Sequence, residues 1–304
     1  MPDKFIVTKD FNNIRLDRWF KQEVLNLPNS LIQRLLRKNK IKVNNKKIKS
    51  SFRLSTGDKV LIYNLSDYKP TNTKKKIQYL PTYKESNKFE NLILFDNEDY
   101  VVINKPRGLA VQSGTKNLKN VIDILKKTKT FEHSKPYIVH RLDKETSGVL
   151  IVAKNREYAQ LLTSLFRIRK IHKTYLAISY GEVSNKYKVL EDNLITYEKD
   201  RKIIQKAVSH IKVLKSSNNY SLLELKPITG RKHQIRKQLY NIGNPVVGDD
   251  KYFIKKNFPS NKSQGLMLHA HKIKFMINGI KYNFETEINK NFKDFLNKKK
   301  LNFF

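Results

Sequence analysis

Residues 137–154 read Tyr-Ile-Val-His-Arg-Leu-Asp-Lys-Glu-Thr-Ser-Gly-Val-Leu-Ile-Val-Ala-Lys, and the rest of the chain can be interpreted around them. Two apolar runs rich in β-branched residues, Ile138–Val139 and Val149–Ala153, flank a charged segment that begins at Arg141. This pattern predicts two buried strands joined by a turn, with Asp143 at the end of the first strand. A carboxylate held there is fixed in direction by the sheet and reachable through the loop, as catalysis requires. A lone Asp in this position would more often only form the turn.

The charge of the chain points to a polyanionic partner. Its 304 residues include 62 basic and 27 acidic side chains, a net charge of +35 that is spread along the whole length. Nucleic acid is the leading candidate for such a partner. Only 13 of the 62 basic residues are Arg, so compositional drift towards lysine is an alternative source of the charge. The length allows one large domain or two modest ones, each with a real core.

Several function classes lack support in the sequence. The chain has no Cys, which excludes a disulfide framework, a thiolate zinc site and a cysteine nucleophile. The glycine-rich motifs of nucleotide-triphosphate, dinucleotide and serine-hydrolase sites are missing, so we expect no cofactor. His269 and His271 lie two apart on an expected strand without a third ligand nearby, so we interpret them as structural and expect no metal. The apolar runs are too short to span a membrane, and we expect a cytoplasmic monomer.

The first 66 residues have the pattern of a compact basic module. Leu31, Ile32, Leu35 and Leu36 form the apolar stripe of a helix for which Ser30 and Gln33 predict a capping box. The same helix carries Arg34, Arg37 and Lys38, and residues 41–49 predict a hairpin with Asn in its turn. Residues 67–90 are polar and without sustained periodicity, so we expect a linker there. A basic helix face suits RNA, although most charged helix faces are merely solvated.

Four sequence motifs carry a resemblance to a known family. Residues 140–148 fit H-R-L-D-x-x-T-S-G, 104–108 fit N-K-P-x-G, 173–177 fit K-x-Y-x-A, and 229–236 fit T-G-R-x-H-Q-I-R. Together they resemble the RluA-type pseudouridine synthases, and the order of motifs in residues 1–66 resembles the alpha-L RNA-binding domain. The resemblance covers nearly the whole chain and is greatest to the subgroup that modifies large-subunit (23S) ribosomal RNA.

The resemblance implies an α+β fold: an alpha-L domain at 1–66, a linker at 67–90, and a catalytic domain at 91–304 with a mixed, mostly antiparallel sheet flanked by helices. It implies isomerisation of uridine to pseudouridine with Asp143 as the nucleophile. Arg231 would pair with Asp143 and keep the carboxylate ionised, and Tyr175 would stack on the flipped base or act as a base. The expected RNA-binding residues are Arg141, His140, Arg236, Arg34, Arg37 and Lys38.

Three alternatives stay open at this point. The substrate could be tRNA instead of ribosomal RNA, because the loops that select the uridine cannot be read from the sequence. The chain could also be a non-catalytic RNA-binding or ribosome-assembly factor with a synthase fold, which an Asp143→Asn variant would reveal. A methyltransferase is the third reading, but it requires a glycine-rich cofactor loop that is missing here.

Overall fold

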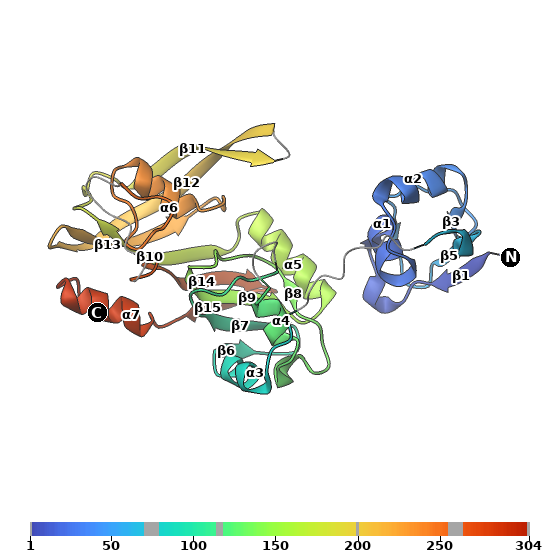
Figure 1. Ribbon diagram of the computed structural model, residues 1–304, viewed down its shortest axis with the longest axis horizontal. Coiled ribbons are helices and arrows are strands. Elements are labelled where there is room, and N and C mark those ends of the chain that lie inside the picture. The colour runs from blue at the N-terminus through green and yellow to red at the C-terminus, as the bar shows by residue number, and fades with distance from the viewer. Residues whose placement is uncertain (1, 70–78, 114–117, 199–200, 255–263, 303–304) are drawn as a thin grey trace. The chain divides into compact units, whose positions relative to one another are not determined.

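The computed structural model describes residues 2–69, 79–113, 118–198, 201–254 and 264–302, which form two compact units, residues 1–77 and 78–304 (Figure 1). The unit boundary falls inside the expected linker, and residues 70–78 of that linker lie outside the described residues. The rest of the expected linker differs from the prediction. Tyr83–Glu90 form a helix, α3, which begins with a reciprocal capping box between Thr82 and Glu85 and buries Phe89 in the core of the second unit. In the part of the chain that the structure describes, no helix is long and apolar enough to cross a membrane.

The first unit packs three helical segments against short strands. Strands β1 (Asp3–Ile6), β5 (Lys59–Ile62) and β3 (Ile41–Val43) form one antiparallel sheet, and β2 (Ile14–Arg15) pairs with β4 (Arg53–Leu54). The helical segments are α1 (Leu16–Trp19), a π-helical turn (Phe20–Val24) and α2 (Asn29–Arg37). Their apolar side chains, with Trp19 and Phe20 almost fully buried, form a core of their own.

Two local predictions for this unit are wrong. The predicted hairpin is not formed, because β3 pairs with β5 and only one isolated bridge joins Val43 to Lys46. The turn at Asn44 and Asn45 is present, with both residues at positive φ. Helix α2 begins after Pro28, so Ser30 lies inside the helix and forms no cap.

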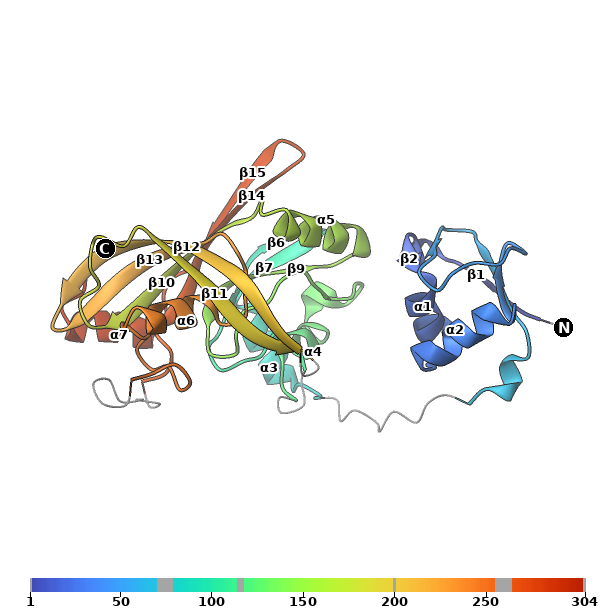
Figure 2. The same ribbon diagram turned by 90° about the horizontal axis from the view of Figure 1, so that it is seen from above.

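The second unit is organised on one large sheet (Figure 2). Among the described residues the sheet has ten strands, in the order β11-β12-β13-β10-β14-β9-β7-β6, with β15 beside β14 and β8 beside β9. All the pairings are antiparallel except that of β14 with β9. The strand bounds are β6 (Ile93–Asp96), β7 (Tyr100–Lys105), β8 (Tyr137–Ile138), β9 (Ser147–Ala153), β10 (His172–Tyr180), β11 (Val189–Glu198), β12 (Arg201–Ser217), β13 (Tyr220–Pro227), β14 (Leu268–Ile277) and β15 (Ile280–Glu285). The predicted mixed, mostly antiparallel sheet is confirmed.

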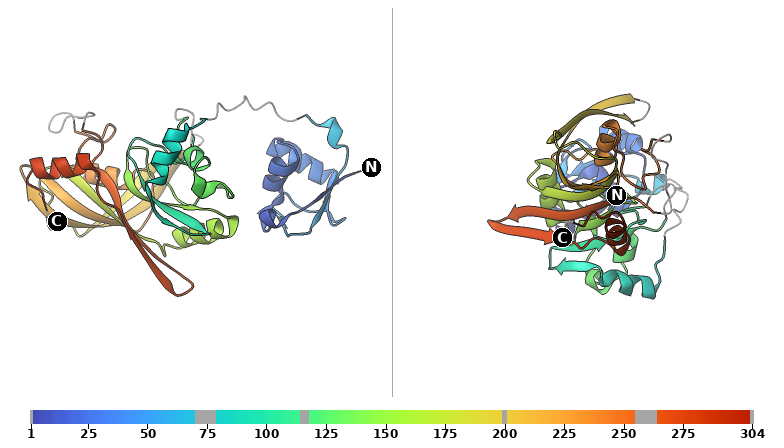
Figure 3. Two further views of the ribbon diagram at one scale, coloured as in Figure 1. Left: turned by 90° about the horizontal axis from the view of Figure 1, so that it is seen from below. Right: turned by 90° about the vertical axis from the view of Figure 1, so that its left-hand side faces the viewer.

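Helices cover parts of both faces of this sheet, as Figure 3 shows from two further sides. They are α3, α4 (Val121–Leu125), α5 (Arg156–Arg167), α6 (Gln234–Asn241) and α7 (Lys290–Lys298). Successive residues of β7 and β9 face opposite sides of the sheet. Val101 and Leu150 pack with α3 and α4, whereas Val102 and Ile151 pack with α5. Burial on both faces explains the continuous apolar run of residues 149–153.

The single parallel pairing explains part of the signature. Gly148 has a φ of +110°, and a β-carbon there would lie 2.1 Å from the carbonyl oxygen of Ala270 on β14. Only glycine allows β9 and β14 to approach so closely. The Ser-Gly of the signature therefore allows β9 to pack against β14, and the loop just before β9 carries Asp143.

Candidate active site

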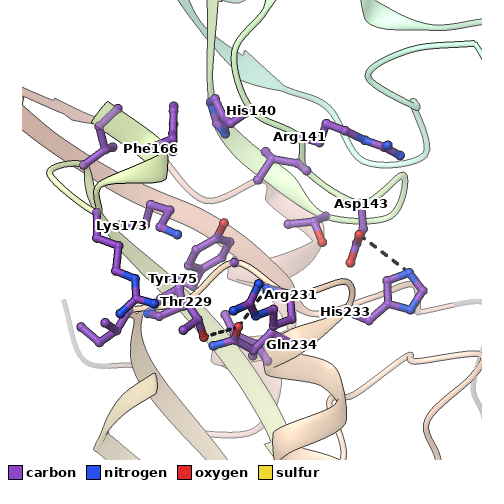
Figure 4. Close-up of a pocket in the computed structure, with 18 of the residues that line it drawn as sticks. His140, Arg141, Asp143, Phe166, Lys173, Tyr175, Thr229, Arg231, His233 and Gln234 are labelled. Atoms are coloured by element: carbon purple, nitrogen blue, oxygen red, sulfur yellow. Dashed lines mark hydrogen bonds and ion pairs between the residues drawn. The ribbon is translucent and has the colours of Figure 1, made fainter. Parts of the chain in front are cut away.

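The loop between β8 and β9 opens into a cavity of about 720 Å³, a volume that suits a small ligand (Figure 4). Three segments supply most of its lining: residues 138–146, the end of α5 with the start of β10, and residues 227–236 before and within α6. Strand β8 ends at Ile138, so Asp143 lies on the loop and not on the strand. The structure brings together at this cavity the predicted residues Asp143, Tyr175, Arg231, Arg141, His140 and Arg236.

The Asp143 carboxylate faces two basic side chains. Its Oδ1 lies 3.8 Å from Nε2 of His233, and its Oδ2 lies 3.9 Å from Nη1 of Arg236. The side chain of Asp143 is 30% exposed, so it is accessible from the cavity. Burial lowers the pKa of His233, and the charge of Asp143 only partly opposes this effect. Arg236 is therefore the permanent positive charge beside Asp143.

A buried carboxylate holds Arg236 in place. Asp249 accepts hydrogen bonds from Nε and Nη2 of Arg236, both at 2.6 Å, and Asp250 accepts a longer one at 3.3 Å. Burial alone would lower the pKa of Arg236. The hydrogen bonds and the charge of Asp249 have the larger combined effect, so the pKa of Arg236 is raised. The forked contact uses one edge of the guanidinium and leaves Nη1 directed at Asp143. The sequence offered one signal for Asp249, its place in the stretch 244–252, but no indication of this role.

The predicted pairing of Arg231 with Asp143 is not formed. The Nε of Arg231 donates to the carbonyl of Lys206, 3.2 Å away on β12, and its guanidinium makes no ion pair with Asp143. Arg236, which was expected to bind RNA, is instead buried: its side chain is 4% exposed and contacts Asp249. The cause is the start of α6: His233 adopts φ +54°, which reverses the chain between the two arginines.

The turn before α6 is fixed by Gln234. Its carbonyl oxygen accepts from the Thr229 hydroxyl and from the Arg231 backbone, and its amide donates to Val208 and Ser209 on β12. This network satisfies the polar groups of a buried turn. It attaches the helix that carries Arg236 to the sheet.

Tyr175 and Lys173 point into the cavity from β10. Burial, and next the charge of Asp143, raises the pKa of Tyr175, so the phenol stays protonated at neutral pH. A protonated phenol can pack against a base and donate a hydrogen bond, but it is a poor proton acceptor. Burial lowers the pKa of the Lys173 amine. Figure 4 shows Lys173 beside the ring of Tyr175.

The other two predicted residues of the catalytic loop, His140 and Arg141, have different surroundings. His140 accepts a hydrogen bond from the Ile151 backbone at Nε2 and stacks on Phe166, with ring centroids 4.4 Å apart. Burial lowers its pKa to about 3, so the ring is neutral and supports the cavity wall. Arg141 is exposed and lines the cavity, and its binding to RNA stays a prediction.

The N-K-P-x-G motif supports the same loop from below. The side chain of Lys105 is fully buried, and its Nζ donates to the carbonyls of Pro106, Leu109 and Lys144. Gly108 also donates its backbone N–H to Lys144. Burial lowers the pKa of Lys105 to about 7. Because Lys144 follows Asp143, these bonds position the carboxylate.

The remaining predicted residues are not among those that line this cavity. Arg34, Arg37 and Lys38 are exposed on α2 of the first unit, where RNA binding stays a prediction. His269 lies between the hydroxyls of Ser147 and Thr286, at 2.9 and 2.8 Å, and His271 contacts Glu285.

Comparisons with known proteins agree with this geometry. The model of a family described as RNA pseudouridylate synthase matches residues 99–241. The ribosomal large subunit pseudouridine synthase C of Buchnera aphidicola subsp. Baizongia pistaciae is 31% identical over 284 residues, which is 88% of each chain. The protein of the same name from Rickettsia felis is 34% identical over 85% of this chain and 87% of its own.

A solved structure supports the fold. Human RNA pseudouridylate synthase domain containing 4 matches with a TM-score of 0.60 and 27% identity, over 71% of this chain and 95% of its own. The match agrees with the sheet on which the loop of Asp143 is built. The fold, the three motifs that line one cavity, the fourth motif that holds the loop of Asp143, and the relatives together show that this chain belongs to the RNA pseudouridylate synthase family.

Proposed function

We propose that the protein isomerises uridine to pseudouridine in large-subunit ribosomal RNA. The observation that carries this proposal is the carboxylate of Asp143, accessible from a nucleotide-sized cavity and faced by the fixed guanidinium of Arg236. The relatives named as ribosomal large subunit pseudouridine synthases supply the substrate class. The reaction breaks the bond from C1′ to N1 of uracil, turns the base and joins C1′ to C5, while C5 loses its proton and N1 gains one. It is an internal rearrangement, so it needs no redox partner and no group donor.

Each residue at the cavity has a role that its contacts support. Asp143 acts as the nucleophile at C1′ or C6, or stabilises a glycal-like species, and each route requires an ionised carboxylate. Arg236 keeps the carboxylate of Asp143 ionised and orients it towards the cavity. Tyr175 packs against the extruded uracil, and its protonated phenol favours this role over that of a base. Arg141, exposed beside the cavity, takes the vacated place in the RNA stack.

The basic surface offsets the cost of extracting the nucleotide. Unstacking and unpairing a base costs a few kcal/mol, which phosphate contacts elsewhere must balance. The exposed Arg34, Arg37 and Lys38 of α2 provide such contacts in our proposal, with residues 1–66 acting as an alpha-L RNA-binding domain. They would position the enzyme on folded RNA without reading bases.

The test is a nucleotide-resolution map of pseudouridine in ribosomal RNA and tRNA from cells with and without the gene. We expect specific pseudouridines to disappear from large-subunit RNA, and to reappear when pure protein is incubated with that RNA without any cofactor. Sites lost from tRNA alone would replace the ribosomal substrate with tRNA. Unchanged maps together with an inactive pure protein would contradict the proposal.

A further inference from the structure

A second cavity, of about 600 Å³, lies on the large sheet beside the first. Its lining comes from β10, β12, β13 and β14 and is strongly basic. Its Arg and Lys residues are Arg169, Lys173, Lys212, Lys226, Lys272 and Lys274, against the two acidic residues Glu224 and Glu285. We call this lining the sheet groove.

The strand register places most of the groove on the opposite sheet face from the active site. Along β10, Lys173 and Tyr175 face the first cavity. Their neighbours His172 and Thr174 therefore face the other side of the sheet, where they line the groove. Lys274 is directly across from His172, and Lys272 from Thr174. On the neighbouring strands, Lys212 is across from Glu224, and His210 from Lys226.

The acidic residues of the groove are already paired. Glu224 lies 2.7 Å from Nζ of Lys226, and Glu285 lies 2.7 Å from Nζ of Lys272. Lys212 and Lys274 are exposed and have no ion-pair partner within the described residues. The groove therefore presents a surplus of positive charge across a width of several strands, which is complementary to a chain of phosphates.

The two cavities share lining residues where β10 and β13 separate. The ladder between β10 and β13 ends at Tyr175 and Leu225, so the strands separate before Lys173 and Pro227. Lys173 and Arg169 line both cavities at this opening. The Lys173 amine is half-buried, and within the described residues no carboxylate lies within 4 Å of it.

Arg169 is held at this opening in an unfavourable backbone conformation. It has φ +62°, in the position just after α5 where helices usually place glycine. A non-glycine residue there is a strained choice, and such strain points to a function of the side chain. Here the side chain lies where the two cavities meet.

We infer that the sheet groove binds the phosphate backbone of the RNA strand that flanks the extruded uridine, with Arg169 and Lys173 contacting the strand as it passes between the cavities. This inference rests on the proposed function and extends it, because it gives the RNA a path beyond the catalytic cavity. The path starts at Tyr175, rounds the sheet edge at Lys173 and continues across Lys212 and Lys274.

Binding of a labelled 20-nucleotide oligouridylate to the full chain, measured over a series of KCl concentrations, tests the path. The groove variant Lys212→Gln/Lys274→Gln is compared with Lys88→Gln/Lys298→Gln, which loses the same charge from exposed positions on α3 and α7. Two lost phosphate contacts reduce the slope of log K against log salt by about 1.4, which corresponds to about 25-fold weaker binding at about 0.1 M KCl. Equal slopes for the two variants would overturn the inference.

Arg169→Gly separates binding from folding. Glycine relieves the strain, so the melting temperature should rise by about 2 °C, while affinity for the oligouridylate falls by about 5-fold through one lost contact. A higher melting temperature with unchanged affinity would remove Arg169 from the path.

Pseudouridine formation in ribosomal RNA distinguishes this inference from the proposed function. If the wild-type protein forms pseudouridine but the groove variant binds the oligouridylate as the control variant does, the inference about the groove is refuted and the proposed function stands. If wild-type protein forms none but the groove variant still loses salt slope, the proposed function fails and the RNA path remains.

Discussion

Replacing Arg236 by Lys tests which arginine serves the catalytic carboxylate. The guanidinium uses Nε and Nη2 to bind Asp249 and directs Nη1 at Asp143. Lysine keeps the charge but has one nitrogen, which cannot serve both carboxylates. Either Asp249 becomes a buried carboxylate without its partner, or Asp143 loses its cation.

The distances give the size of both effects. Unit charges 3.9 Å apart attract by about 4 kcal/mol at an effective dielectric constant of about 20. Asp143 is 30% exposed, so screening by solvent reduces this to about 1–2 kcal/mol. We therefore expect kcat of Arg236→Lys to fall by about 10-fold. Breaking the buried contact with Asp249 should lower the free energy of unfolding by about 3 kcal/mol.

Arg231→Lys is the matched comparison. Arg231 makes one hydrogen bond to a backbone carbonyl, in an exposed setting, so its replacement should lower kcat by less than about 3-fold. Single-turnover rates of pseudouridine formation, with unfolding by urea measured in parallel, determine both quantities. If Arg231→Lys abolished turnover while Arg236→Lys kept the wild-type rate, the pairing seen in the structure would be refuted.

Three further predictions concern the loop, the core and the first unit. Lys105→Met should lower the free energy of unfolding by about 2 kcal/mol, because the carbonyls of Pro106 and Leu109 lose their donor. The same variant should also slow turnover. Urea unfolding that matches wild type would contradict this prediction. Burial lowers the pKa of His269 to about 4. Between about pH 6.5 and pH 4, His269 is therefore protonated in the unfolded chain but neutral in the native chain. Stability should then fall by about 2 kcal/mol between pH 7 and pH 5, and His269→Gln should remove that part of the loss; an equal acid loss in the variant would count against it. Replacing Arg34, Arg37 and Lys38 together by Gln should raise KM for ribosomal RNA and reduce its salt dependence with kcat unchanged; an unaltered salt slope would exclude RNA binding by α2.

The sequence predicted the features that rest on local patterns. The sheet follows from runs of apolar residues, whereas Asp143 was predicted at the end of the first strand and lies on the loop after β8. Three of the four motifs line one cavity, as the family resemblance implied. Tyr175 was assigned to the site from its place in the K-x-Y-x-A motif of the family, and it lines the cavity.

The features that depend on long-range contacts were not predictable. Two arginines five residues apart both fit the role of partner to Asp143, and the choice depends on the reversed backbone at His233 and on Asp249, 13 residues beyond Arg236. Helix α3 has weak periodicity and owes its place to Phe89 in a core supplied by later segments. Strand β3 pairs with β5, which lies 16 or more residues later in the chain and buries Val60 and Ile62 fully.

The role of Asp143 can be measured most directly with Asp143→Asn, which keeps the shape of the side chain and removes its charge. The control is Asp250→Asn, which removes a carboxylate that is 45% exposed and that also contacts Arg236. We expect no pseudouridine from Asp143→Asn, with affinity for ribosomal RNA within about 3-fold of wild type, and near-normal turnover from Asp250→Asn. Normal pseudouridine formation by Asp143→Asn would contradict the account.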